Sequence, residues 1–238
     1  MNPYQKLLER KRTWTPVQAT AGTIKDESYD VLMRALALRH MELPVGDFIN
    51  EALDTEVPLL ARELLQSNVK DEEKHDLALG YIANAHGVDA KAETEALRLR
   101  DAWTAHPDHT ITKAMVAERA IFFVLLPLFR ALGDAGMRNC SFDISRDEQV
   151  HVACNSIVHL ELGHNISPSL DRLRKATISW VLQPLSATNS NKHLNKKFWS
   201  DSSDRLMYEG KAPELSFTKA ARVPAFFEHS NNDLPQYA

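Results

Sequence analysis

Two Glu-x-x-His pairs are the clearest candidates for chemistry in this sequence. Glu72 and His75 form one pair, and Glu148 and His151 form the other. Residues three apart lie on one face of a helix, one turn from each other, so the carboxylate and imidazole of a pair can bind the same metal ion. A single pair means little, because 16 Glu and 10 His among 238 residues produce roughly 0.7 such pairs by chance.

The spacing of the glutamates is more informative, because it recurs. Glu42 lies 30 residues before Glu72, and Glu118 lies 30 residues before Glu148. A shift of 76 residues superimposes the first set on the second, histidines included. The chain therefore contains one arrangement twice: a helix with a single Glu, followed by a helix with Glu-x-x-His.

This arrangement is the ligand set of di-iron and di-manganese carboxylate bundles. Carboxylate oxygens and imidazoles suit Fe²⁺ and Mn²⁺, and burying so many charged groups would be costly without cations. Taken alone, each residue could instead be a solvated carboxylate or an ordinary buried histidine. The predicted ligands of two metal ions are Glu42, Glu72, His75, Glu118, Glu148 and His151.

Two other candidates match the ligands by residue type but not by position. Glu161 and His164 form a third pair, but it lies at a predicted helix end without a partner helix. Glu51 is a poor substitute as a ligand, since on one continuous helix it would lie about 32 Å from Glu72 at about 1.5 Å per residue. We interpret both as coincidences.

Apolar periodicity predicts the helices that position these residues, and no convincing strand pattern occurs. Leu43-Pro44 should end the first helix, and Pro58 should kink the second. The predicted apolar helices cover about 26–43, 45–86, 112–132 and 142–162, with a polar helix over 89–104 and one or two helices between 168 and 207. We expect an all-α protein with one helical domain over 1–210, irregular over 1–25, and a flexible tail over 211–238.

Composition excludes several other classes of protein. The net charge of -4 and the scattered Lys and Arg give no sign of a nucleic-acid partner. The longest apolar run, 120–129, is too short to cross a membrane. Cys140 and Cys154 do not form a C-x-x-C motif and fit reduced thiols, and residues 1–12 lack a secretion signal. We expect a cytoplasmic protein, in the host cytoplasm if the chain is viral.

Two segments resemble the small, radical-generating subunit of class I ribonucleotide reductase. They are Glu118-Arg-Ala-Ile-Phe-Phe and Ile144-Ser-Arg-Asp-Glu-Gln-Val-His151, in which Arg-Asp-Glu-x-x-His is the most specific match. The resemblance covers about residues 26–165. It implies a ferritin-like bundle with a four-helix core, two metal ions (Fe and/or Mn), a homodimer and a separate large catalytic subunit that makes deoxyribonucleotides.

The resemblance also implies roles for residues around the metals. Asp147 would hydrogen-bond His75 and take part in radical transfer. Trp14 resembles the N-terminal tryptophan of the same route, although it could equally be a core or lid aromatic. Four side chains would form an apolar pocket that keeps water from the cofactor, or simply pack in the core. They are Leu79, Phe122, Leu126 and Ile144.

The main departure from the family concerns the radical. Most members have a tyrosine one helical turn after the first ligand histidine, where this chain has Leu79. Tyr81 is close in sequence but lies on another helix face. The sequence resembles members that keep the oxidising equivalent on the metals, as a manganese-iron centre does.

The C-terminal tail resembles the peptide that docks the small subunit on the large one. Phe226-Phe227-Glu228 and the segment 233–238 carry this resemblance. Tyr237 could relay the radical or serve as an apolar anchor, or the tail could have no role.

Two other functions use the same ligand set. An oxygen-activating hydroxylase or oxidase of ferritin-like fold would need a substrate cavity beside the metals. A metal-storage protein would need neither the Trp14 segment nor a docking peptide.

Overall fold

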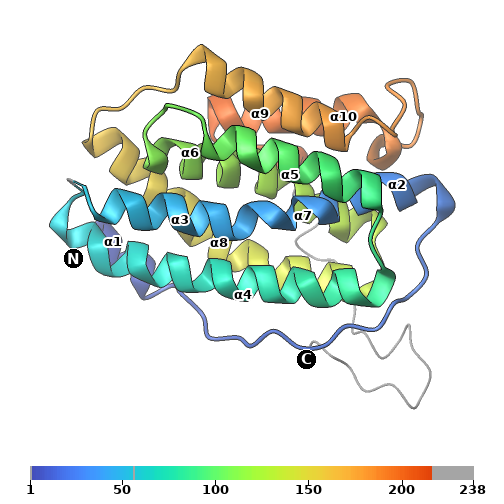
Figure 1. The fold of residues 1–238 in the computed structure, drawn as a ribbon, viewed down its shortest axis with the longest axis horizontal. Coiled ribbons are helices and arrows are strands. Elements are labelled where there is room, and N and C mark those ends of the chain that lie inside the picture. The colour runs from blue at the N-terminus through green and yellow to red at the C-terminus, as the bar shows by residue number, and fades with distance from the viewer. Residues whose placement is uncertain (1, 56, 216–238) are drawn as a thin grey trace.

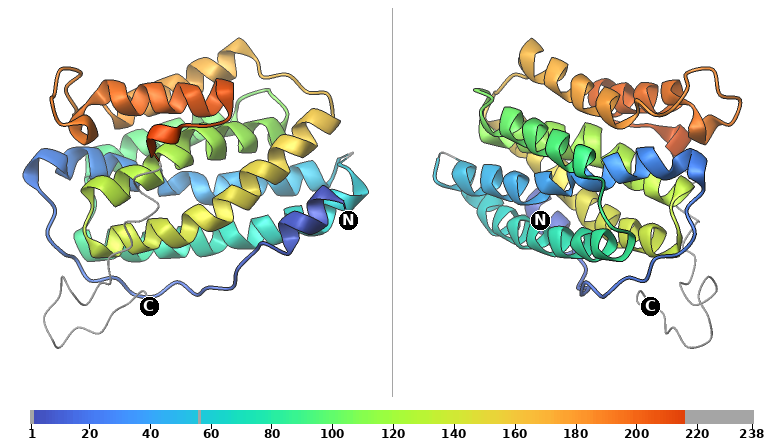
Figure 2. Two further views of the ribbon diagram at one scale, coloured as in Figure 1. Left: turned by 180° about the vertical axis from the view of Figure 1, so that it is seen from behind. Right: turned by 45° about the vertical axis from the view of Figure 1, so that its right-hand side comes forward.

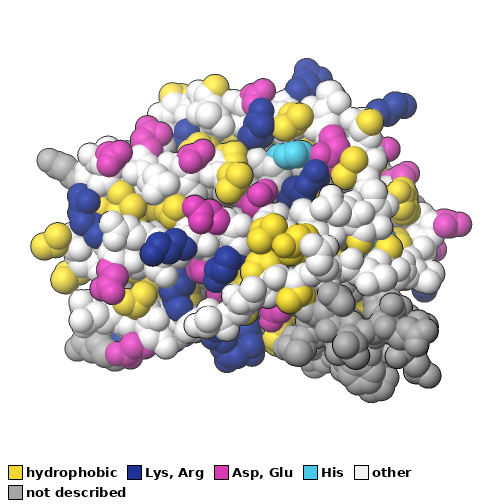
Figure 3. All heavy atoms as spheres, turned by 60° about the horizontal axis from the view of Figure 1, so that its bottom comes forward, with side chains coloured by type: hydrophobic (Ala, Val, Ile, Leu, Met, Phe, Trp, Pro, Cys, Tyr) yellow, Lys and Arg dark blue, Asp and Glu magenta, His cyan; other side chains and the backbone are white. Residues whose placement is uncertain are grey.

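The computed structural model describes residues 2–55 and 57–215, and the described chain folds as a bundle of helices (Figure 1). Within these residues no strand forms, and a single isolated bridge joins Ser186 to Asn195. The all-α prediction is confirmed. None of the described helices is long and apolar enough to cross a membrane. On the face drawn in Figure 3, basic and acidic side chains are interspersed.

Four helical stretches form the core of the bundle. Helix α3 packs against α4 and α6, and α8 packs against α4, α6 and α7. A π-helical turn, Glu118–Phe122, joins α6 to α7. The inward faces carry a continuous apolar cluster. The bounds are α3 Glu42–Leu53, α4 Arg62–His86, α6 Thr110–Ala117, α7 Phe123–Leu132 and α8 Ala135–Glu161.

The expected helix end at Leu43-Pro44 is wrong. Helix α2, Asp26–Ala37, passes through a 3-10 turn, Leu38–Met41, straight into α3. Pro44 lies in the first turn of α3, where its missing N–H costs no α-helical hydrogen bond. Burial of the inner face of α3 outweighs the local preference of the residue before proline.

The expected continuous helix over 45–86 is also wrong. Helix α3 ends at Leu53, and a short connection with Pro58 in an extended conformation leads into α4. The chain reverses there, so α3 and α4 lie side by side rather than end to end (Figure 1). The distance along one helix between Glu51 and Glu72 therefore no longer applies, but Glu51 is exposed on α3.

Helix α8 begins earlier than the predicted residue 142. Asp134 caps it by accepting a hydrogen bond from the Met137 backbone N–H at 2.8 Å. The same carboxylate accepts from the Gly22 N–H at 2.6 Å and contacts His86 Nε2 at 2.9 Å. One side chain thus joins α8, the end of α4 and the N-terminal segment.

Replacing Asp134 by Ala should lower the free energy of unfolding by about 2 kcal/mol, because a helix cap and a buried hydrogen bond are lost together. Asp134→Asn keeps the cap and should cost less. The pKa of Asp134 lies below its ordinary value, because bonds to His86 and two backbone N–H groups outweigh burial. The difference in the free energy of unfolding between wild type and D134A should therefore be complete above about pH 4 and shrink as pH falls further. Urea denaturation at several pH values checks this; equal stability of wild type and D134A would contradict it.

The remaining helices and the N-terminal segment surround this core. Residues 1–25 are not wholly irregular, since α1, Pro3–Leu8, is helical with Asn2 as its cap. Residues 9–25 then run along the bundle from α1 to α2, as Figures 1 and 2 show. The predicted helices at 89–104 and between 168 and 207 are confirmed. They are α5 Ala90–Thr104, α9 Pro168–Val181 and α10 Lys196–Glu209.

The first residues of the predicted tail pack on the bundle. Glu214 accepts a hydrogen bond from the Ser202 hydroxyl of α10 at 2.8 Å, and Leu215 is buried. Residues 216–238 lie outside the described chain, so the predictions for 226–228 and Tyr237 cannot be placed.

Candidate metal centre

The structure brings the six predicted ligands together at the centre of the four-helix core. Each is at most 1 % exposed. Helix α4 supplies one Glu-x-x-His pair and α8 the other. Glu42 starts α3, and Glu118 starts the π-helical turn. Such turns are frequent at functional sites, because they shift a side chain out of the α-helical register.

The imidazole of His75 directs Nδ1 at three carboxylates. This nitrogen lies 3.2 Å from Glu148, 3.5 Å from Glu72 and 3.6 Å from Glu42. His75 and Glu42 therefore lie on one side of the centre, facing the two glutamates of the Glu-x-x-His pairs.

His151 has the matching position on the other side. Its Nδ1 lies 2.8 Å from Glu72, 3.6 Å from Glu118 and 3.7 Å from Glu148. Glu72 and Glu148 thus face both imidazoles, whose stacked rings have centroids 5.6 Å apart. This geometry fits two cations, each with its own Glu and His, and two shared carboxylates.

The donor atoms themselves indicate that cations belong here. In this group, both oxygens of Glu42, Glu72 and Glu148, one oxygen of Glu118 and the Nδ1 atoms of both histidines are buried without a hydrogen-bond partner. Buried polar atoms without partners are rare in proteins. Side-chain atoms of two Glu and two His come within 4.8 Å of one another, so the group could hold a dimetal centre. The residues fit such a cofactor.

Electrostatics support this interpretation. Burial raises the pKa of Glu42 and Glu118 well above the ordinary value, and neighbouring carboxylates raise each further. Glu72 differs, because the two imidazoles outweigh its burial and hold its pKa at about 2. Burial would lower the pKa of His151, but Glu72 and the other carboxylates raise it to about 10. The metal-free centre thus retains protons that metal binding would displace.

Asp147 links the centre to the N-terminal segment. Its Oδ2 contacts His75 Nε2 at 3.3 Å and accepts a hydrogen bond from the Trp14 indole at 2.7 Å. The Trp14 ring stacks on the His75 ring with centroids 6.1 Å apart, and the Lys74 ammonium lies 5.1 Å from the Trp14 centroid. Trp14 is only partly buried, so these contacts connect the centre to the protein surface.

Asp71 has the same role at the other histidine and was not predicted. Its Oδ2 lies 3.1 Å from His151 Nε2, and Lys11 forms an ion pair with it. Each aspartate precedes a ligand glutamate on one helix and contacts the histidine of the other. The 76-residue shift that relates the ligands also relates Asp71 to Asp147, so the repeat contained this signal.

Imidazole contacts lower the pKa of both aspartates despite burial, so both stay ionised and orient their histidines. Asn155, also not predicted, donates to Glu118 at 2.6 Å from one turn after His151. It occupies the place that corresponds to Leu79 in the first pair.

The four predicted apolar residues are all buried in the common core, whereas Tyr81 is partly exposed. The four apolar residues are Leu79, Phe122, Leu126 and Ile144.

None of the six predicted ligands lines the three surface pockets of about 570, 470 and 280 Å³.

Comparison with solved structures finds a chain of similar fold. A crystal structure from Bacillus halodurans, of a candidate class I ribonucleotide reductase, superimposes with a TM-score of 0.59. The alignment covers 96 % of this chain and 94 % of that one at 12 % sequence identity. No family model matches the sequence, and no curated protein matches it. The likeness shows that the two chains share an all-α, helical-bundle fold.

Replacing Asp71 or Asp147 by Asn should weaken metal binding roughly 10- to 100-fold, because a neutral amide holds a ligand imidazole less firmly. Titration against a fluorescent chelator measures this affinity. Glu73→Gln, an exposed change on the same helix as Asp71, should leave it unaltered. Wild-type affinity in both Asn variants would show that neither aspartate supports a ligand.

Proposed function

We propose that this chain is the small subunit of a class I ribonucleotide reductase. Its dimetal centre would be activated by oxygen or superoxide and would initiate ribonucleotide reduction in a separate large subunit. The observation that carries the proposal is the hydrogen-bonded connection from His75 through Asp147 to Trp14. A metal-storage protein has no need of a connection from its centre to a partly exposed tryptophan.

Two iron or manganese ions in this centre would supply a strong one-electron oxidant. Glu42 and His75 would hold one ion and Glu118 and His151 the other, while Glu72 and Glu148, which face both imidazoles, would contribute to both. The protein contributes position and enclosure, because all six side chains are buried and come from rigid helices.

The surrounding residues would keep the oxidant from being quenched. Leu79 and Phe122 belong to the apolar core and offer neither a proton nor an electron at low potential. Because Leu79 replaces the usual tyrosine, we propose that the oxidising equivalent stays on the metals. An electron paramagnetic resonance spectrum of active protein with a stoichiometric tyrosyl signal would exclude this.

Trp14 and Asp147 would form the exit route for the oxidising equivalent. The Trp14 indole N–H donates a 2.7 Å hydrogen bond to Asp147. Loss of an electron from Trp14 can therefore be coupled to movement of the indole proton toward this carboxylate. Tyr237 would extend the route within a C-terminal docking tail, and the protein would act as a cytoplasmic homodimer.

Reconstitution tests the proposal. The protein is loaded with iron, manganese or both under oxygen, mixed with a class I large subunit, and assayed for deoxynucleotide formation. Turnover that requires both metal and large subunit is expected. Failure with every metal mixture, together with oxidation of a small hydrophobic substrate, would favour a ferritin-like oxidase or hydroxylase instead.

A further inference from the structure

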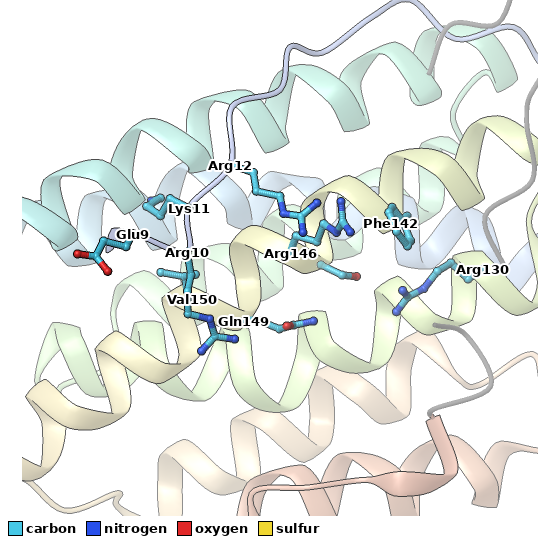
Figure 4. A pocket seen from close by; sticks show the side chains of 10 residues that line it. Glu9, Arg10, Lys11, Arg12, Arg130, Phe142, Arg146, Gln149 and Val150 are labelled. Atoms are coloured by element: carbon cyan, nitrogen blue, oxygen red, sulfur yellow. The ribbon is translucent and has the colours of Figure 1, made fainter. Parts of the chain in front are cut away.

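A basic pocket of about 570 Å³ lies between the N-terminal segment and helices α7 and α8 (Figure 4). The N-terminal segment supplies Arg10, Lys11 and Arg12, α7 supplies Arg130 and α8 supplies Arg146. Glu9 is the single acidic residue in the lining, and Figure 4 shows its carboxylate pointing away from the guanidinium groups. The protein as a whole is acidic, with a net charge of -4, so this concentration of positive charge is local.

Among the described residues, no carboxylate pairs with the arginines that line the pocket. Lys11 pairs with Asp71, but none of the four arginines has a carboxylate partner within residues 2–55 and 57–215. The Arg130 Nε atom is buried without an acceptor, and burial lowers the pKa of this side chain to about 10. A partly buried guanidinium without an anion is unfavourable, so the pocket is suited to a ligand that supplies negative charge.

The pocket also offers contacts for an uncharged, planar part of a ligand. The Phe142 ring lies in the lining, with the Arg146 guanidinium 4.5 Å from its centroid. Gln149 adds an amide that can both donate and accept hydrogen bonds. A volume of this size is typical of small-molecule sites.

We propose that this pocket binds a phosphorylated small molecule of the nucleoside diphosphate or triphosphate class. Guanidinium groups match phosphate oxygens with paired hydrogen bonds, and four of them balance a ligand with three or four negative charges. The aromatic ring and the amide would receive the base. The site is separate from the metal ligands, and its existence does not depend on the proposed redox function.

Calorimetry on the full-length, metal-loaded protein tests the proposal, with ATP, ADP, tripolyphosphate and an oligoglutamate peptide as probes. Metal content is measured before and after, so that chelation by the phosphates is detected. ATP and tripolyphosphate should bind once per chain. The double variant R12Q/R146Q should weaken both at least tenfold, since each contact is charge-assisted. Arg130→Gln provides a second variant if the double change disturbs folding.

The matched control is Arg98→Gln, which removes an exposed arginine on α5 outside the pocket and should leave binding unchanged. Tighter binding of ATP than of tripolyphosphate would identify a nucleotide as the ligand, and equal binding would identify the oligophosphate alone. Absence of phosphate binding, equal loss in the R98Q control, or preference for oligoglutamate would each overturn the proposal.

Discussion

The full-length protein loaded with Mn²⁺ or Fe²⁺ at two sites is expected to melt roughly 10–20 °C above the metal-free protein. Metal at about 100 times its dissociation constant stabilises a folded protein by about 2.7 kcal/mol per site. In a chain of this size each kcal/mol raises the melting temperature by about 2–4 °C. The physical reason is the set of buried, unpartnered oxygen and nitrogen atoms on the six ligands, which only cations can satisfy together.

Glu118→Gln should have opposite effects on the two states. The metal-free variant should be more stable than wild type by about 1 kcal/mol or more, because folding buries a carboxyl group whose ionised form is disfavoured by burial and by neighbouring carboxylates, and glutamine has no such ionisation to suppress. The metal-induced rise should shrink, because a ligand is lost. Calorimetric melting of both states measures the two effects, and Glu161→Gln, an exposed change on α8, is the control. A metal-free E118Q less stable than wild type would contradict the assignment.

Under the proposed function, Trp14→Phe is expected to lower deoxynucleotide formation at least on the order of 100-fold while two metals stay bound. Phenylalanine is not oxidised at the potentials that oxidise tryptophan, and it cannot donate the hydrogen bond to Asp147. The measurements are turnover with the large subunit and metal content of the same preparation. Trp180→Phe changes a tryptophan on α9 far along the chain from this route and should retain activity.

Variants of the two aspartates distinguish a role in radical transfer from a purely structural role. Asp71 and Asp147 contact equivalent histidines, but only Asp147 bonds Trp14. Asp147→Asn, saturated with metal, should therefore lose turnover in the same way as W14F, whereas metal-saturated Asp71→Asn should keep it. Equal activity of W14F and wild type, or equal losses in D71N and D147N, would argue against the route.

Helix boundaries show where the sequence was misleading. Leu43-Pro44 has the local character of a helix end, yet Pro44 falls in a first turn, where proline is tolerated. Pro58 has the local character of a kink, yet the chain reverses there. In both cases the packing of α3 on its neighbours decides the outcome, and local patterns do not contain that information.

The candidate site was more predictable than the helix boundaries. A duplicated ligand pattern fixes residue types and spacing regardless of where a helix begins, and the six side chains lie close together in the structure. Asp71 follows from the same repeat but requires applying the 76-residue shift to Asp147 as well. The basic pocket could not be predicted, because residues 10–12, Arg130 and Arg146 come together only when the N-terminal segment lies along the bundle.

Anomalous diffraction from crystals of the full-length protein soaked with Mn²⁺ tests the central claim most directly. We expect two peaks about 3.5–4 Å apart in the bundle core. One should adjoin His75 and Glu42, and the other His151 and Glu118. No peak between the two histidines, with manganese only on the protein surface, would contradict the dimetal centre.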